Sequence, residues 1–298
     1  MHLDLNLLKC FRAVAETGSV SKAGAILNLS QPAISTQIKK LEEQLGRGLF
    51  NRHNRGLSLS EAGTELLAYA RQIANTERSL VTFFQNERAE PTGVIRVGSY
   101  TTATSYLIAR TVAKFLKGNP GVSVTYDYDE SKSILRKIAA YELDCAILSD
   151  VPDHDLLDRT LFFKDRLVFA ASPSRPEAKK QRLTPKDFAS MEFLSYPHRT
   201  DLCYRRVEEH YGRHLLKARV VLESTSFDTL KQMLLHGAGC TFIPKYLVAS
   251  ELKAGKLVEI PIEGPALPIQ FYFITRRGSN LSRATKTFQK KICTLLLS

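Results

Sequence analysis

The chain has 298 residues, 44% of them hydrophobic, which suits two or three lobes with a sizeable core. No run approaches the roughly 18 consecutive apolar residues that a membrane span needs. The first residues, MHLDLNLLKCFRAV, carry acids and an early lysine, unlike a signal peptide. A membrane protein and a secreted protein are therefore not expected, and we predict a cytoplasmic location.

The net charge of +12 is unevenly distributed. Residues 1–90 hold 11 Lys and Arg against 9 Asp and Glu, whereas residues 91–298 hold 31 against 21. Within the first part, cations gather in residues 20–58, where only Glu42 and Glu43 oppose them. These cations are Lys22, Lys39, Lys40, Arg47, Arg52 and Arg55. Such a local cluster suits contact with phosphates, while the C-terminal surplus suits an anionic ligand or a solvated basic surface.

Five cysteines occur, with no CxxC pair, which argues against a disulfide framework and a zinc site. They are Cys10, Cys145, Cys203, Cys240 and Cys293. The simpler interpretation is five reduced, mostly buried thiols; a redox switch at Cys203 is the alternative. We expect no metal and no cofactor.

The first 90 residues have the apolar spacing of helices. The expected helices span residues 7–17, 19–27, 31–45 and 60–86. A tight turn at residues 28–30 separates the second helix from the third. The segment Glu-Pro-Thr-Gly at residues 90–93 breaks the long fourth helix and marks a hinge.

After the hinge, strand and helix patterns alternate, which predicts parallel sheets covered by helices. The expected strands span residues 94–100, 122–128, 145–150, 166–172, 192–197, 219–223, 240–245 and 269–275. The expected helices span residues 104–116, 133–142, 202–212, 227–237 and 282–297. Two α/β lobes joined by crossing strands would bind a small ligand between them.

The third helix is amphipathic. Ile34, Ile38 and Leu41 share one face, and the opposite face carries Ser, Thr and Lys side chains. Ser30 can cap this helix, and Pro32 suits its first turn. Short polar side chains near a helix N-terminus can reach base edges, while lysines neutralise phosphates. By itself, the pattern fits a DNA-reading helix and a solvated surface helix equally well.

Residues 1–65 resemble the N-terminal domain of the LysR-type transcriptional regulators. The matching motifs are SQPAISTQIKKLEEQLGRGLFNR at residues 30–52 and LSLSEAG at residues 57–63. The chain departs from the family pattern at Gly24, where alanine is usual, and at Ser60, where threonine is usual. The resemblance implies a winged helix-turn-helix. It assigns base-edge or groove contacts to Gln31, Pro32, Ser35 and Thr36, and backbone contacts to Lys22, Lys39, Arg52 and Arg55. Ser30 is also expected among the DNA-binding residues.

The rest of the chain is similar to the effector-binding domain of the same family. The landmarks are VIRVGSYTTATSYL, NPGV, YELDCAI, LVFAASP and GAGCTFIP. The resemblance implies an α/β fold of two lobes, like that of periplasmic binding proteins. It divides the chain into a DNA-binding domain (1–59), a linker and dimerisation helix (60–90), and an effector-binding domain (91–298) with lobe I (91–162 and 268–298) and lobe II (163–267).

Three loops are expected to meet between the lobes, each before a helix whose N–H groups favour an anion. They carry Thr101, Thr102 and Thr104; His198, Arg199 and Thr200; and Thr225, Ser226 and Phe227. Glu130 is expected at the rim. Arg199 could bind a carboxylate with two hydrogen bonds, which predicts a small anionic effector. Helix capping by the hydroxyls and a surface ion pair for Arg199 are the alternatives.

Operator DNA and a small-molecule effector are thus the expected partners, with RNA polymerase as a further candidate. The resemblance also implies a homodimer or homotetramer through the 60–90 helix. An enzyme is not expected, because GxSxG, P-loop and HExxH motifs are missing and His210 and His214 have no third ligand. A solute-binding protein would require a signal peptide and would not need the first 90 residues.

Overall fold

The computed structural model describes residues 3–53, 56–85, 90–100, 103–151, 153–197 and 202–294. The chain forms two compact units, one built from residues 1–89 and the other from the rest, except that 140–142 and 280–282 group with the first. No described helix combines the length and the hydrophobicity that crossing a bilayer requires.

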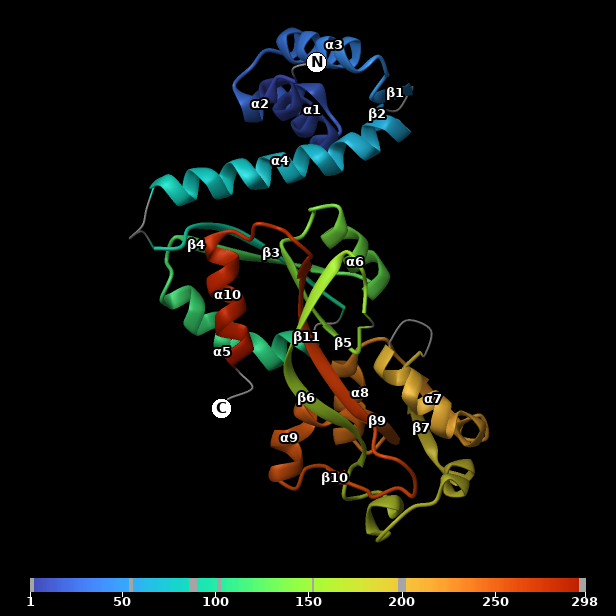
Figure 1. The fold of residues 1–298 in the computed structure, drawn as a ribbon. Helices are drawn as coiled ribbons and strands as arrows, with labels where there is room; N and C mark the ends of the chain where they lie inside the picture. Colours follow the sequence, from blue (N-terminus) through green and yellow to red (C-terminus); the bar gives the residue numbers. More distant parts are fainter. Residues whose placement is uncertain are drawn as a thin grey trace. The chain divides into compact units, whose positions relative to one another are not determined.

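The first unit is a small helical domain with a two-stranded hairpin and a long helix (Figure 1). Its elements are α1 (Leu5–Thr17), α2 (Val20–Leu27), α3 (Gln31–Leu45), β1 (Phe50–His53), β2 (Gly56–Leu59) and α4 (Glu61–Gln85). The first three helices end at Gly18, Asn28 and Gly46, which have positive φ and stop each helix sharply. Phe11 and Leu41 are fully buried in the core between the helices.

The N-terminal part of α4 belongs to this core. Leu67 and Ala70 are buried against it. Two ion pairs tie α4 to α1: Lys9 Nζ lies 2.8 Å from Glu77 Oε1, and Arg71 Nε lies 3.2 Å from Glu16 Oε1. Further along α4, Leu80 and Val81 are exposed. Among the described side chains of α4, the core of the first unit therefore covers Leu67 and Ala70 but leaves Leu80 and Val81 exposed.

The second unit consists of two α/β lobes (Figure 1). Lobe I contains β3 (Gly93–Ser99), α5 (Ala103–Lys117), β4 (Val122–Tyr128), α6 (Ser131–Ala139), β5 (Cys145–Ser149) and α10 (Arg283–Cys293). Lobe II contains η1 (Pro176–Lys179), η2 (Pro185–Ser190), β7 (Glu192–Ser195), α7 (Leu202–Leu215), β8 (Arg219–Glu223), α8 (Phe227–Leu235), β9 (Cys240–Pro244), α9 (Lys245–Lys253) and β10 (Val258–Glu259).

Two long antiparallel strands, β6 (Leu157–Ala171) and β11 (Pro268–Arg276), connect the lobes. The sheet order is β4-β3-β5-β11-β6-β9-β7-β8, with β10 paired to β6. Within each lobe the β3–β4, β3–β5, β7–β8 and β7–β9 pairs are parallel, as predicted. The connecting strands make the whole sheet mixed, because β11 is antiparallel to both β5 and β6.

Several elements of this unit were not predicted: the first part of β6, helix α9, and the short elements η1, η2 and β10. Strand β6 starts at Leu157, nine residues before the predicted start at Arg166. Residues 158–165 (DRTLFFKD) gave no strand signal, because charged residues flank a short apolar run without the alternation typical of a strand. Helix α9 was not predicted because it follows the apolar strand β9 directly, and Pro244 stands at its N-cap.

Candidate nucleic-acid interface and effector-binding region

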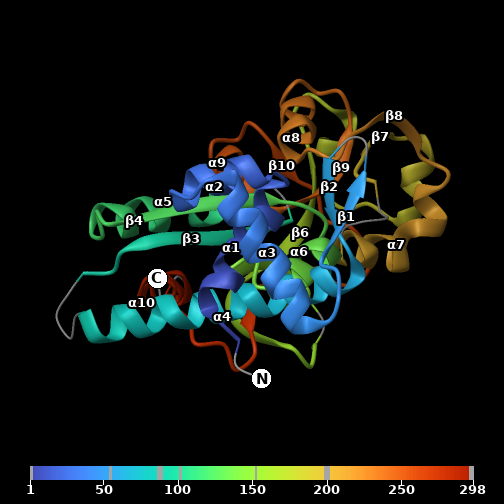
Figure 2. The same ribbon diagram turned by 90° about the horizontal axis from the view of Figure 1, so that it is seen from above.

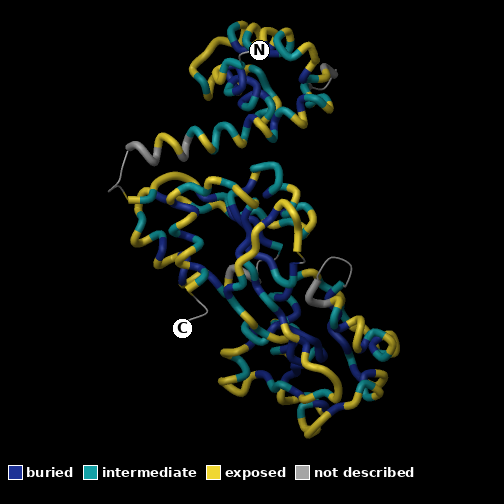
Figure 3. Tube along the Cα trace, viewed as in Figure 1, coloured by how far each residue is buried: buried dark blue, intermediate teal, exposed yellow. Residues whose placement is uncertain are grey.

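The third helix presents one buried face and one exposed face. Ile34 and Leu41 are fully buried, and Ile38 is nearly so. Ser30 is the N-cap, and its Oγ accepts a hydrogen bond from the N–H of Ala33 at 3.3 Å. The exposed residues are Gln31, Pro32, Ser35, Thr36, Lys39 and Lys40. In Figure 3, exposed residues alternate with intermediate and buried ones along α3, as expected for a helix with one face in the core.

The turn between α2 and α3 is tight. Asn28 has φ 55°, and the N–H of Leu29 donates to the carbonyl oxygen of Gly24 at 2.9 Å. A Cβ added to Gly24 would lie 2.6 Å from the carbonyl oxygen of Leu29. This close approach explains why glycine replaces the usual alanine here. The Oγ of Ser21 donates to Oε1 of Gln31 at 3.0 Å, which orients the Gln31 side chain at the start of α3.

Strands β1 and β2 form an antiparallel hairpin after α3, in the position of a wing (Figure 2). Leu49, which is 1% exposed, lies where α3, the hairpin and α4 meet. Its N–H donates to Oε1 of Glu42 at 2.7 Å, and its carbonyl accepts from the N–H of Ser60 at 3.0 Å. Between α3 and the hairpin lies a groove of about 450 Å³, lined in part by Thr36, Lys39 and Phe50, and also by Val14 of α1 and Val20 of α2.

In the second unit, side chains from the two lobes meet at the carboxyl ends of the strands. Tyr100 follows β3 and Tyr196 follows β7, and their hydroxyl oxygens lie 2.5 Å apart. The ring of Tyr196 stacks on Phe227, with centroids 4.5 Å apart and an interplanar angle of 15°. Phe227 is the first residue of α8, and the preceding Ser226 caps that helix.

Two further polar contacts join the lobes. The Arg206 guanidinium of α7 lies 2.9 Å from the Asp150 carboxylate after β5, and the Asp150 side chain is 6% exposed. Tyr106 of α5 donates a hydrogen bond to Asp228 of α8, which raises the pKa of Tyr106. These contacts bring two carboxylates, Asp150 and Asp228, to the junction, together with Arg206, whose guanidinium is paired with Asp150.

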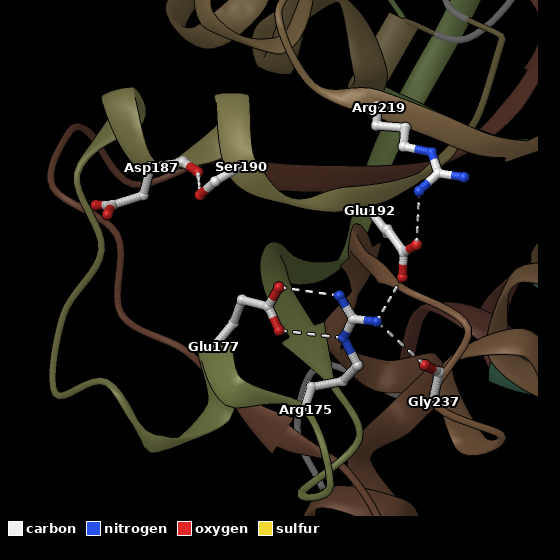
Figure 4. A network of polar contacts seen from close by, with 7 residues as sticks. All are labelled: Arg175, Glu177, Asp187, Ser190, Glu192, Arg219 and Gly237. Atoms are coloured by element: carbon white, nitrogen blue, oxygen red, sulfur yellow. Dashed lines mark hydrogen bonds and ion pairs between the residues drawn. The ribbon is translucent and has the colours of Figure 1, made fainter.

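A polar network stabilises lobe II away from this junction (Figure 4). The Arg175 guanidinium forms two hydrogen bonds to Glu177, at 2.9 and 3.1 Å, and one to Glu192 at 2.7 Å. The side chains of Arg175 and Glu177 are 15% and 8% exposed. Arg219, which is 77% exposed, reaches the other oxygen of Glu192 at 3.3 Å. Arg175 therefore provides most of the positive charge that balances the carboxylates of Glu177 and Glu192.

Two family models cover nearly the whole chain. The model of the bacterial regulatory helix-turn-helix protein, lysR family, matches residues 5–64, and the LysR substrate binding domain model matches residues 88–292. The chain belongs to the LysR family. It is therefore a DNA-binding transcriptional regulator with an effector-binding domain.

Relatives of this LysR-type chain are similar to it over nearly its full length. The RuBisCO operon transcriptional regulator of Allochromatium vinosum is 26% identical over 97% of this chain and 95% of its own. A full-length OxyR variant from Pseudomonas aeruginosa has the same fold, with a TM-score of 0.76 at 19% identity over 98% of this chain and 95% of that one. Full-length LysG from Corynebacterium glutamicum with bound effector Arg gives 0.69 at 20% identity, covering 99% and 98%.

The structure places the predicted DNA contacts of this LysR-type regulator on the surface wherever it describes them. The exposed ones are Lys22, Ser30, Gln31, Pro32, Ser35, Thr36 and Lys39. Thr36 Oγ1 donates to the carbonyl of Pro32 at 2.9 Å, and Lys39 lies 3.8 Å from Glu43. Arg55 and the side chain of Arg52 lie outside the described residues. These contacts with DNA stay predictions.

Most of the predicted effector contacts lie outside the described residues. These are Thr101, Thr102, His198, Arg199, Thr200 and the side chain of Thr104. Glu130 and Thr225 are exposed, while Ser226 accepts the N–H of Thr229 at 3.3 Å, so that Ser226 caps α8 as the alternative interpretation held. Phe227 is 4% exposed beneath Tyr196, so it supports the junction rather than opening onto its surface.

Tyr100, Tyr196, Asp150 and Arg206 were missed by the sequence analysis. Tyr100, Asp150 and Tyr196 each lie in the last two residues of a predicted strand and directly follow the corresponding observed strand. The rule that ligands bind beyond the carboxyl ends of parallel strands would have selected them. Arg206 lies inside α7, and no sequence signal distinguishes it from its neighbour Arg205.

The four cysteines whose side chains are described are protonated thiols. Burial raises the pKa of Cys10, Cys145, Cys240 and Cys293, in the case of Cys240 to about 12. A reactive cysteine needs its thiolate form, which these sites disfavour. The side chain of Cys203 lies outside the described residues. Over the described residues, no three His, Cys, Asp or Glu side chains gather in a way that could hold a metal ion.

Proposed function

We propose that α3 of this regulator enters the major groove of operator DNA and that Gln31, Ser35 and Thr36 contact base edges there. One observation carries the proposal: the polar face of α3 is exposed along its length while Ile34, Ile38 and Leu41 hold the other face in the core. The N-terminal residues of such a helix are those that reach bases. The hairpin β1–β2 is the wing, and Arg52 and Arg55 would bring positive charge to the DNA backbone.

Genomic footprinting with the full chain tests this function. We expect discrete protected sites, each with two half-sites related by two-fold symmetry, because the exposed part of α4 would pair with the same helix of a second copy. Leu80 and Val81 on that part support the pairing. A dimer and a tetramer would both present DNA-binding domains in pairs. Binding without any preferred sites at low salt would contradict the proposal.

Substitutions in α3 and in the wing should differ in their effects. We expect Ser35→Ala to weaken binding at particular base pairs by about 1–3 kcal/mol, and Gln31→Ala to do the same. Arg52→Ala should weaken binding to all sequences and reduce the slope of log K against log salt by about 1. Titrations of operator and scrambled duplexes at several salt concentrations measure both effects. An unchanged slope for Arg52→Ala would remove Arg52 from the phosphate contacts.

For the effector we infer a small carboxylate bound between the lobes. Arg199 and the N-terminus of α7 would hold its negative charge, because the Arg206 guanidinium is already paired with Asp150. The hydroxyls of Tyr100 and Tyr196 would give further hydrogen bonds. LysG, which shares the fold, has a bound effector Arg, a molecule that carries a carboxylate.

A thermal-shift screen of the full chain with small carboxylates tests the effector. At a ligand concentration about 100 times its Kd, we expect the effector-binding domain to gain about 2.7 kcal/mol, a rise in Tm of about 5–10 °C. Arg199→Ala should abolish the shift, and Arg205→Ala serves as the matched control. If amines or uncharged sugars stabilise the chain and carboxylates do not, the effector is not an anion.

A redox-sensing regulator of the same architecture is the second candidate. It rests on Cys203, which the sequence places at the start of α7, next to the junction between the lobes. The buried Cys240 does not favour a thiolate partner for it. If peroxide changes operator binding and Cys203→Ser abolishes that change, this candidate replaces the carboxylate sensor. In either case we expect the regulator to act in the cytoplasm, with RNA polymerase as a further partner.

A further inference from the structure

A carboxylate lies in the groove between α3 and the wing, where a DNA-binding surface should avoid one. Glu42 lines this groove together with Lys39 and Thr36 of the same helix and Phe50 and Leu57 of the hairpin. Lysine and hydroxyl groups contact phosphates, and the apolar walls suit deoxyribose. A free carboxylate at this place would repel the DNA backbone. The position of Glu42 therefore calls for a role other than contact with DNA.

The hydrogen bonds of Glu42 indicate that role. Its Oε1 accepts the N–H of Leu49 at 2.7 Å, one residue before β1 begins at Phe50. Its main-chain carbonyl accepts the N–H of Gly46, the residue that ends α3 with φ 66°. Gly46 ends the reading helix, and Glu42, one turn before that end, holds the start of the first strand of the wing.

The end of the hairpin that leads into α4 is also held at Leu49. The carbonyl of Leu49 accepts the N–H of Ser60, and Ser60 Oγ donates to the carbonyl of Gly48 at 2.8 Å. These bonds fix the hairpin relative to α4, whereas Glu42 provides the described side-chain hydrogen bond from α3 to the start of the hairpin. The width of the groove between α3 and the wing therefore depends on Glu42.

We propose that Glu42 is a positioning residue that sets the wing at a fixed distance from α3, so that the groove between them fits the sugar-phosphate backbone of one DNA strand. The inference rests on the proposed roles of α3 and the wing. In this role the Glu42 carboxylate acts as a hydrogen-bond acceptor for the N–H of Leu49. The acceptor oxygen matters, and the charge does not.

Three substitutions in the full chain separate the acceptor from the charge. Glu42→Gln keeps an acceptor oxygen and removes the charge, Glu42→Ala removes both, and Glu42→Asp keeps the charge but is too short to reach Leu49. Glu43→Ala is the matched control, because Glu43 is the next residue of α3, is 66% exposed, and pairs only loosely with Lys39 at 3.8 Å. Binding is measured with an operator duplex from the footprint and with a scrambled duplex at several salt concentrations.

We expect Glu42→Gln and Glu43→Ala to bind both duplexes at least as tightly as the original chain. Glu42→Ala and Glu42→Asp should each bind more weakly, and the loss should be the same factor for the operator as for the scrambled duplex. The slope of log K against log salt should fall in magnitude by about 1 for each wing cation that no longer contacts a phosphate. Hydroxyl-radical footprints should lose protection at the wing and keep it at α3. Unfolding curves check that the domain is folded, and if the alanine variant does not fold, the Asp and Gln variants still decide.

Two results would overturn the inference: a Glu42→Asp variant with the original salt slope and footprint, or a Glu42→Gln variant as weak as the Asp variant. The first would show that the distance to Leu49 is irrelevant, and the second that the charge itself is required. Neither result would affect the proposed function. That function fails only if the original chain shows no preferred DNA sites.

Discussion

Replacing Arg175 with methionine should destabilise the effector-binding domain by about 3–5 kcal/mol, because Glu177 would remain buried without its partner. Glu177 is 8% exposed and receives two of the Arg175 hydrogen bonds, and Glu192 receives a third (Figure 4). Calorimetry of the full chain, in which the two units can unfold separately, measures this as a fall of about 6–20 °C in the Tm of the second unit.

Two control variants separate this effect from loss of packing. Arg219→Ala removes a largely exposed arginine from the same network and should change the free energy of unfolding by less than about 1 kcal/mol. The double variant Arg175→Met with Glu177→Leu removes both buried charges and should recover most of the lost stability. A double variant that is less stable than Arg175→Met alone would contradict the argument from the buried charge.

Gly63→Ala should destabilise the DNA-binding domain by about 3 kcal/mol, at the upper end of the usual cost of overpacking. A Cβ at Gly63 would lie 2.1 Å from the carbonyl oxygen of Leu49, and this backbone atom cannot move without breaking its hydrogen bond to Ser60. The first turn of α4 would have to leave the hairpin. Operator affinity should therefore fall together with the Tm of the first unit.

Gly48→Ala is the matched control, because a Cβ at Gly48 meets no atom within 4 Å and its φ is not positive. This variant should keep the Tm and the operator affinity of the original chain. Near-equal Tm values for the two alanine variants would show that α4 can move away from Leu49 at little cost. In that case, the junction at Leu49 would not hold the wing and α4 together.

Much of the fold could be predicted because its signals are local. The apolar residues of α3 recur at helical spacing, Ser30 and Gly46 stand at its two ends, and both features are visible in a short stretch of sequence. The alternation of strands and helices predicted two α/β lobes in the same way. Even the departure at Gly24 was visible in the sequence, although its cause was not: only the folded turn brings the carbonyl of Leu29 close to it.

The contacts that matter for function join residues far apart in the chain, and no local pattern reports them. Tyr100 and Tyr196 meet only because β6 and β11 cross between the lobes. Composition and spacing therefore determined which segments are helices and strands, and the family motif determined the class of regulator. Only the tertiary structure decided that Glu42 binds the start of the wing and that tyrosines join the lobes, because each depends on how separate elements pack.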